Sequence, residues 1–336
     1  MEANFYKKTL IFKRPGGTSR GVLHKKDTYI LELLSKDKKG VGECGLFRGL
    51  SYDDRPDYEL KLQWLCDNIH LSSEELYEEL VHYPSIWFGY EQAMQNLKFG
   101  SDVYFPSSFT QKENSITING LIWMGNVDFM KEQIEAKLKE KFHCIKLKIG
   151  VNWEEERLVI EELRRSFPKE QLELRVDANG AFSLEKAYDV LKQLADLDIH
   201  SIEQPIKAGQ WSEMANLCKE TPTAIALDEE LIGVVDYSKK VELLDSILPQ
   251  YIILKPSLVG GFKGSDEWIS LSEERGIGWW ITSALESNIG LNAIAQYTFN
   301  KQNPMPQGLG TGALFTNNFE SSLQLVGDQL FYKGLE

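Results

Sequence analysis

The sequence predicts an α/β protein in which a (β/α) barrel follows an α+β segment. From about Ile116 to Gly312, eight short strand-like runs alternate with amphipathic helical stretches. Such alternation is typical of parallel strands covered by helices, and eight repeats match a closed barrel. A doubly wound open sheet is the structural alternative. That fold predicts a glycine-rich phosphate-binding turn near the first strand, and the sequence has none there.

The α+β segment precedes the repeat. It combines strand-like alternation with turn residues and two stretches of helical periodicity. Ser72 and Ser73 are candidate helix caps, because serine hydroxyls accept hydrogen bonds from the first free amides of a helix. We expect strands at Asn4–Lys13 and Thr28–Leu34, a hairpin turn at Lys36–Gly40, and helices within Asp57–His82 and Trp87–Phe99.

Two loops are expected in this segment. The first, Arg14–Lys26, contains three glycines and several basic residues, and the second is Leu46–Asp57. Such a composition is typical of a mobile surface loop, but it also suits a lid that closes over an anion. In the lid interpretation, Arg20 approaches a carboxylate of the substrate.

The barrel elements follow from the switch between periods of two and 3.6 residues. The tail, Phe315–Glu336, is too short for its own core and is expected to pack on the N-terminal unit. The expected strands are Ile116–Trp123, Cys144–Gly150, Glu173–Asn179, Ser201–Pro205, Ala224–Leu231, Tyr251–Ser257, Gly278–Ser283 and Pro306–Gly312. The expected helices are Val127–Lys141, Trp153–Ser166, Leu184–Leu197, Trp211–Thr221, Asp236–Leu248, Ser265–Arg275 and Ile289–Phe299.

Charge and composition exclude several classes of protein. The formal net charge of −13 argues against a nucleic-acid partner. The sequence contains no run of 18 apolar residues, so no membrane span is expected. The N-terminus has no apolar signal core. The four cysteines form no CxxC pair, which fits thiols in a reducing cytoplasm. The composition does not predict an oligomeric state.

Charged side chains recur where five consecutive barrel strands end. Lys148, Asp177, Glu203, Asp228 and Lys255 are separated by 29, 26, 25 and 27 residues, about one βα unit each. Side chains alternate across a strand, so Lys146 shares the face of Lys148, and Asn179 shares that of Asp177. Barrel enzymes keep their chemistry at the carboxyl ends of the strands. These residues are therefore expected to meet in one site.

Three carboxylates on neighbouring strand ends predict a metal site. In a dry cavity Asp177, Glu203 and Asp228 cannot all stay ionised without a cation. Oxygen ligands favour a hard ion, so we expect Mg²⁺, with Mn²⁺ as a substitute. The alternative is a set of structural salt bridges at the barrel mouth.

The motifs KLK, VDANG, IEQP, LDE and LKPS, in this order and spacing, resemble the enolase superfamily and within it the muconate-lactonising subgroup. The resemblance covers essentially the whole chain. It implies a modified (β/α)7β TIM-like barrel at 116–312, an α+β capping domain at 1–115, and a C-terminal segment at 313–336 that packs back on the capping domain. In this superfamily a lysine or histidine base works with Mg²⁺ on an enediolate.

The resemblance also implies a role for each matched residue. Lys148 would be the base, Lys255 the lysine on the opposite face of the substrate, and Lys146 the neighbour that lowers the pKa of Lys148. Asn179 would orient the site. The metal ligands would be Asp177, Glu203 and Asp228.

The last two strands bear on the reaction. Epimerases of the subgroup typically carry an acidic DxD motif near the eighth strand, where this chain has Gly308, Gly310 and Thr311. Glycine amides and hydroxyls, with Ser283 of the seventh strand, suit a carboxylate rather than an ammonium. The same segments resemble the dehydratases of menaquinone biosynthesis, which act on a cyclohexadiene dicarboxylate. A simple turn is the alternative interpretation of the glycines.

Other activities stay open at this point. N-acylamino acid racemases and dipeptide epimerases share the lysine and carboxylate motifs. From other classes, Lys255 could be the nucleophile of a Schiff-base aldolase, or the barrel could be an inactive binding scaffold. The resemblance predicts a metal-dependent lyase that acts on a small dicarboxylate in the cytoplasm.

Overall fold

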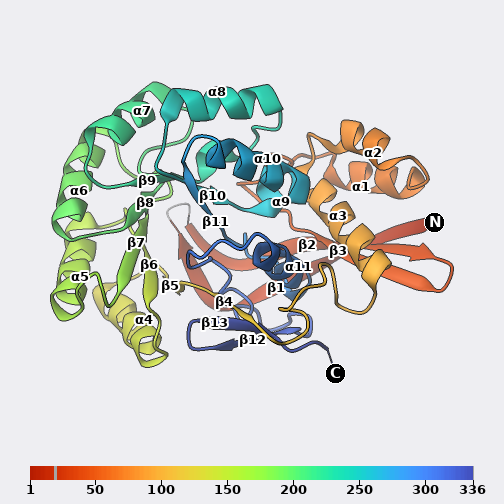
Figure 1. Cartoon of the computed structure of the whole chain (residues 1–336), viewed down its shortest axis with the longest axis horizontal. Helices are drawn as coiled ribbons and strands as arrows, with labels where there is room; N and C mark the ends of the chain where they lie inside the picture. The colour runs from red at the N-terminus through yellow and green to blue at the C-terminus, as the bar shows by residue number, and fades with distance from the viewer. Residues whose placement is uncertain (19–20, 336) are drawn as a thin grey trace.

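The centre of the protein is a curled sheet of seven parallel strands (Figure 1). The computed structural model describes residues 1–18 and 21–335. The strands lie in the order β11-β10-β9-β8-β7-β6-β5, so each strand pairs with its neighbour along the chain. Their bounds are β5 (Gly120–Ile122), β6 (Cys144–Lys148), β7 (Glu173–Asp177), β8 (Ser201–Glu203), β9 (Ile225–Leu227), β10 (Tyr251–Leu254) and β11 (Gly278–Ile281).

The eighth expected strand forms bridges rather than a regular ladder. Gln307 bridges to Ile118 beside β5, and Gly308 bridges to Thr282 beside β11. The close approach requires a glycine, because a Cβ on Gly308 would lie 2.3 Å from the hydroxyl of Thr282. This segment therefore links the two edge strands of the sheet, as the expected barrel requires.

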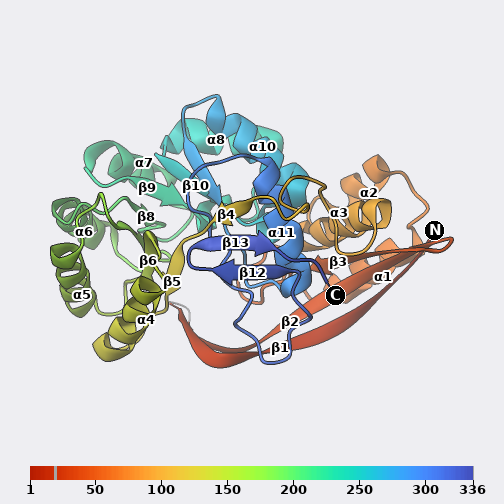
Figure 2. The same cartoon turned by 60° about the horizontal axis from the view of Figure 1, so that its bottom comes forward.

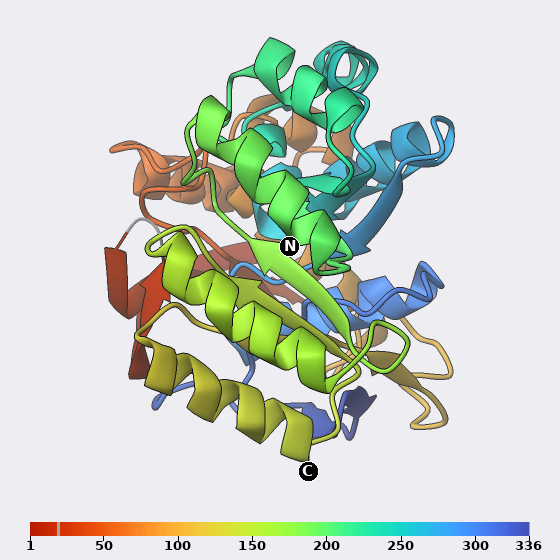
Figure 3. The ribbon, with the colours of Figure 1, turned by 90° about the vertical axis from the view of Figure 1, so that its left-hand side faces the viewer.

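Helices cover the outer face of the sheet, and Figure 3 shows α4, α5 and α6 side by side over it. Helix α6 illustrates why they form. Ser183 caps its first turn, and its buried residues Ala187, Val190, Leu191 and Leu194 recur at helical spacing. The bounds are α4 (Val127–Lys139), α5 (Trp153–Ser166), α6 (Leu184–Asp196), α7 (Trp211–Glu220), α8 (Tyr237–Ile247), α9 (Pro256–Val259), α10 (Gly261–Glu273) and α11 (Asn288–Asn300), with a 3₁₀ turn at η1 (Glu229–Leu231).

The N-terminal segment is a three-stranded antiparallel sheet packed against helices. Helix α3 lies close to β3 because Gly42 has no side chain; a Cβ there would lie 2.0 Å from the carbonyl oxygen of Gly89. Ser72 caps α2 through a reciprocal capping box with Glu75. The bounds are β1 (Glu2–Thr18), β2 (Gly21–Ser35), β3 (Lys38–Cys44), α1 (Tyr58–Asp67), α2 (Ser73–Leu80) and α3 (Pro84–Phe99).

In place of the expected loop Arg14–Lys26, residues 14–18 and 21–26 form the far end of a β-hairpin. Strands β1 and β2 stay paired as far as Thr18 and Gly21, with one register irregularity between Ile11 and Gly16. Figure 2 shows this hairpin as one long ribbon. The loop prediction was wrong because strand preference depends on the partner strand as well as on composition. The glycines and basic residues of this segment pair with the opposite strand of the hairpin. The lid residue Arg20 lies outside the described residues.

The C-terminal tail contacts both parts of the chain. Strands β12 (Leu323–Val326) and β13 (Gln329–Tyr332) form a sheet with β4 (Ser115–Thr117). Phe315 bridges to Phe12 of β1, and their rings lie 4.7 Å apart. We propose a capping domain at 1–115, a catalytic barrel at 116–312 and a C-terminal segment at 313–336. No helix within the described residues is long and apolar enough to cross a membrane.

Two adjacent aspartates of the loop before α1 should respond oppositely to pH. Burial raises the pKa of Asp53 to about 6, although hydrogen bonds from Ser85 favour its ionised form. The pKa of Asp54 is lowered: its burial acts upward, but the Gly49 amide and Arg48 outweigh it. Stability from Asp53 is thus lost as pH rises through about 6. Stability from Asp54 is lost as pH falls through its lowered pKa.

We therefore expect Asp53→Asn to gain stability relative to the parent protein as pH rises from about 4 to 7. Asp54→Asn is the matched control. It should be less stable than the parent at neutral pH, with a deficit that shrinks in acid. Urea midpoints measured from about pH 2.5 to 7, expressed as the difference from the parent protein, test both slopes. Slopes of the same sign would contradict the assignment.

Candidate active site

Three carboxylates form a row at the carboxyl ends of neighbouring strands. Asp177 ends β7 and lies opposite Glu203, which ends β8. Asp228 directly follows β9. All three are buried, with exposed fractions of 1%, 0% and 2%. The sequence spacing of one βα unit therefore does place these side chains at one level of the sheet.

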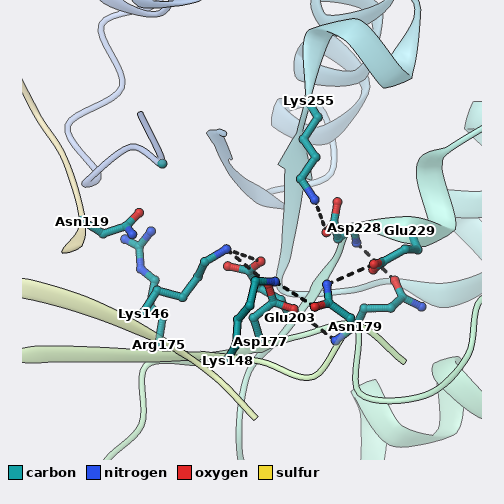
Figure 4. A network of polar contacts seen from close by, with 12 residues as sticks. Asn119, Lys146, Lys148, Arg175, Asp177, Asn179, Glu203, Asp228, Glu229 and Lys255 are labelled. Carbon is teal, nitrogen blue, oxygen red and sulfur yellow. Dashed lines mark hydrogen bonds and ion pairs between the residues drawn. The ribbon is translucent and has the colours of Figure 1, made fainter. Parts of the chain in front are cut away.

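Lysine ammonium groups contact every carboxylate in this row (Figure 4). Lys146 Nζ lies 2.8 Å from Glu203 Oε2 and 3.4 Å from Asp177 Oδ2. Lys148 Nζ donates to Asp177 Oδ2 at 2.8 Å. Lys255 forms an ion pair with Asp228. The lysines of β6 and the lysine after β10 approach the row from different sides, so Lys148 and Lys255 flank it.

The mutual charges perturb these groups in different directions. Burial alone would raise the pKa of Asp177, but Lys148, Lys146 and Lys255 lower it far below its usual range. Burial raises the pKa of Glu203 to about 7 because only Lys146 offsets it. Burial acts downward on the pKa of Lys146, yet Glu203 and Asp177 raise it overall. Lys146 is therefore held as a cation.

Asn179 and Gln204 hold the row in place. Asn179 accepts from Lys148 at 2.8 Å and donates to Glu229 at 3.1 Å. The Gln204 amide oxygen accepts from the backbone N–H of Asp228 at 3.2 Å. Both residues have positive φ, 45° and 39°, which turns the chain sharply after its strand. The sequence analysis missed Gln204, although it stands in the IEQP motif.

A cavity opens over the row and is lined by the three lysines, Asp177 and Asn179. The predicted binding residues Ser283, Gly308, Gly310 and Thr311 also line it, and the two hydroxyls lie 2.7 Å apart. The rest of the wall is mostly apolar. Lining residues that the sequence analysis did not single out include Phe47, Leu50, Asn119, Leu121, Trp123 and Leu285.

The active-site cavity is not lined by Glu43, Glu286, Trp279 or Trp280, whose contacts support the fold. The start of α11 is capped by Glu43 of β3, which accepts from the amides of Ser287 and Gly290 at 2.9 Å. Glu286, which precedes this helix, accepts from Ser257 and Ala284. Neither Trp279 nor Trp280 lines the active-site cavity; Trp280 lies 4.2 Å from the guanidinium of Arg175.

The donor set fits a hard divalent cation. Glu203 Oε1 is buried and has no hydrogen-bond partner within the described chain, so its lone pairs are available. As they stand, the described residues contain no group of three acidic, histidine or cysteine side chains that could hold a metal ion. The positive charges near the acids come from lysines: Lys146 contacts Asp177 and Glu203, and Lys255 contacts Asp228. A bound cation would replace part of these contacts.

The curled parallel sheet and its row of acids and lysines define a class of barrel enzymes. The family model "Enolase C-terminal domain-like" matches residues 129–324, more than half of the chain. This chain belongs to that family, the enolase superfamily.

Relatives place it more narrowly. It is 46% identical to an o-succinylbenzoate synthase from Desulfotalea psychrophila, over 98% of both chains. The crystal structure of MenC from that organism superposes with a TM-score of 0.88 at 43% identity, covering 98% of this chain and 99% of that one. An N-succinylamino acid racemase from Thermus thermophilus is 35% identical, over 47% of this chain and 40% of its own length.

Proposed function

We propose that this chain is an o-succinylbenzoate synthase. It would dehydrate 2-succinyl-6-hydroxy-2,4-cyclohexadiene-1-carboxylate, with Mg²⁺ as cofactor and Mn²⁺ as a substitute. The observation that carries the proposal is the buried row Asp177, Glu203 and Asp228, with Lys148 and Lys255 in contact with it from β6 and from the end of β10. The full-length relative of that name supports the choice of reaction.

Lys148 is the proposed base. Lys148 lines the cavity. Its Nζ donates to Asp177 Oδ2 and to Asn179 Oδ1, both at 2.8 Å. The neutral amine takes the proton from the ring carbon that bears the carboxylate, and the electron pair moves into the carboxylate as an enediolate. The pair then returns to the ring and expels the neighbouring hydroxide. The Lys148 ammonium gives its proton to that hydroxide, so water leaves and the ring becomes aromatic.

The enediolate needs positive charge where it forms. Mg²⁺ held by Asp177, Glu203 and Asp228 would stabilise the second negative charge that develops on the substrate carboxylate. Lys255 adds a fixed cation; Asp228 and Glu229 raise its pKa although burial acts in the opposite direction. Lys146 bridges Glu203 and Asp177 and holds them at their spacing. These charges act strongly because the side chains are buried.

The lining of the cavity favours a dicarboxylate over a dipeptide. A buried ammonium requires an acidic partner. Asp177 is the one carboxylate among the lining residues, and two lysines already occupy it. The raised pKa of Lys255 likewise disfavours a Schiff-base aldolase, which needs a neutral amine. N-succinylamino acid racemisation is the second candidate, since that substrate has no ammonium and the Thermus relative bears that name.

A direct comparison of substrates tests the proposal. With Mg²⁺, the purified protein should form o-succinylbenzoate with kcat/KM of about 10⁴ M⁻¹s⁻¹ or more. Racemisation of an N-succinylamino acid should be slower. Aromatic absorbance reports the first reaction, and polarimetry reports the second. A racemase rate tenfold higher, or undetectable dehydration, would reverse the assignment.

We also propose that the protein works in the cytoplasm. Its four cysteines are all free and buried, as expected of thiols that are never oxidised to disulfides. The substrate is a small molecule, and the net charge of −13 gives no attraction for nucleic acid.

A further inference from the structure

The ammonium group of Lys26, in β2, is buried, and no hydrogen bond joins it to another described residue. The residue is 7% exposed, and among the described residues its Nζ is buried with no hydrogen-bond partner. Lys26 lies opposite Leu10 in the β1–β2 hairpin, and Leu10 packs in a cluster with Leu285. A buried, unpaired ammonium costs several kcal/mol, so such a group is rare unless an anion joins it.

Neighbouring acids do not supply that anion. Glu286 is near enough for Lys26 to lower its pKa, although burial raises that pKa overall. The two Glu286 oxygens are already taken by the Ser257 hydroxyl at 2.5 Å and the Ala284 amide at 2.6 Å. Asp27 is held by Lys7 at 2.7 Å and by Thr9 at 2.6 Å. Within the described residues, no acid therefore forms a hydrogen bond with the ammonium of Lys26.

A second cavity brings Lys26 next to the active site. Its lining residues are Leu23, Lys25, Lys26, Asp27, Phe47, Arg48 and Leu285. Phe47 and Leu285 also line the active-site cavity, so they form a common apolar wall. Arg48 adds positive charge but is held by Asp54 and by the hydroxyl of Tyr29. Lys26 is the buried lysine of this second cavity, and the side chains of Phe47 and Leu285 lie between this cavity and the active-site cavity.

We propose that Lys26 binds the carboxylate at the end of the substrate's succinyl arm. This inference rests on the proposed function. The ring carboxylate belongs beside Lys148 and Lys255, where the enediolate forms. The ketone and methylene groups of the arm suit the wall of Phe47 and Leu285, and the terminal carboxylate meets Lys26. The capping segment would then select dicarboxylates, while the barrel performs the chemistry.

A ligand that lacks only the arm carboxylate isolates this contact. The Mg²⁺-loaded protein is titrated calorimetrically with o-succinylbenzoate and with 2-butanoylbenzoate, which has a methyl group in place of that carboxylate. Lys26→Met should weaken o-succinylbenzoate binding by at least about 30-fold, as expected for loss of a buried charge pair. It should change 2-butanoylbenzoate binding by less than about twofold, because this ligand never met the charge.

Lys38→Met is the matched control, since Lys38 is an exposed lysine of the same three-stranded sheet, lines neither cavity and loses the same charge. It should weaken o-succinylbenzoate by less than about threefold, because exposed charges are screened. Lys26→Arg should retain most of the affinity. In the absence of ligand, Lys26→Met should unfold at a higher temperature than the parent, because an unpaired buried charge is gone. A structural lysine would give the opposite shift. Lys26→Gln replaces Lys26→Met in the same titrations if the methionine variant does not fold.

The outcomes separate the two proposals. If the parent protein forms o-succinylbenzoate but Lys26→Met weakens both ligands equally, or neither, the Lys26 subsite is wrong and the proposed function stands. Equal losses in Lys38→Met and Lys26→Met would also overturn the subsite. If the parent protein neither binds nor forms o-succinylbenzoate, the proposed function itself fails, and the subsite fails with it.

Discussion

Replacing Lys148 with alanine is expected to lower kcat by at least several orders of magnitude. In the proposed mechanism one amine removes the ring proton and later protonates the departing hydroxide, so both proton transfers are lost together. The Nζ of Lys148 is held at 2.8 Å from both Asp177 and Asn179, and a water molecule has no comparable anchor or basicity. Dehydration rates under saturating substrate measure the effect.

The control for this variant is Lys192→Ala, which removes an exposed lysine from α6 and should leave kcat unchanged. Circular dichroism and calorimetric binding of o-succinylbenzoate show whether Lys148→Ala is folded and still binds the product. If Lys148→Ala retains more than about a tenth of the parent kcat, Lys148 is not the base. Lys255→Ala should also be severely impaired, because it removes the fixed cation beside Asp228.

Removal of divalent metal is expected to abolish dehydration, with recovery on addition of Mg²⁺ or Mn²⁺. Without the cation, the second charge of the enediolate would form beside the buried acids Asp177, Glu203 and Asp228. With Lys148 neutral as the base, Lys146 and Lys255 supply two positive charges against three acids and leave no excess for the substrate. Full activity after exhaustive demetallation would contradict the metal assignment.

Asp228→Asn tests the ligand set separately from activity. It should weaken Mg²⁺ binding in calorimetry and raise the Mg²⁺ concentration needed for half-maximal rate, because an amide oxygen is a poorer ligand than a carboxylate. Asp189→Asn, at an exposed position of α6, removes the same charge far from the row and should change neither value. Equal Mg²⁺ affinity in Asp228→Asn and the parent would remove Asp228 from the proposed ligands.

The sequence by itself determined the parallel sheet and the row of charged residues. The strands are short runs rich in apolar residues and most of the helices have one apolar face, so local periodicity defines the elements. Chain connectivity then aligns the strands, and a spacing of 25 to 29 residues brings Asp177, Glu203 and Asp228 to one level. The motifs also indicated the family, because each carries a charged group that the shared chemistry needs.

Only the tertiary structure decided what depends on contacts between distant segments. The β1–β2 hairpin extends through the expected loop because its two strands pair with each other, which neither strand's composition reveals. Gln204 joins the site through a backbone amide 24 positions away. Lys26 resembles its exposed neighbour Lys25 in the sequence, but folding buries Lys26 beside Leu285 and leaves its charge unpaired. Burial and pairing are properties of the packed chain. They distinguish an exposed, solvated lysine from a buried lysine that has no hydrogen-bond partner within the described residues.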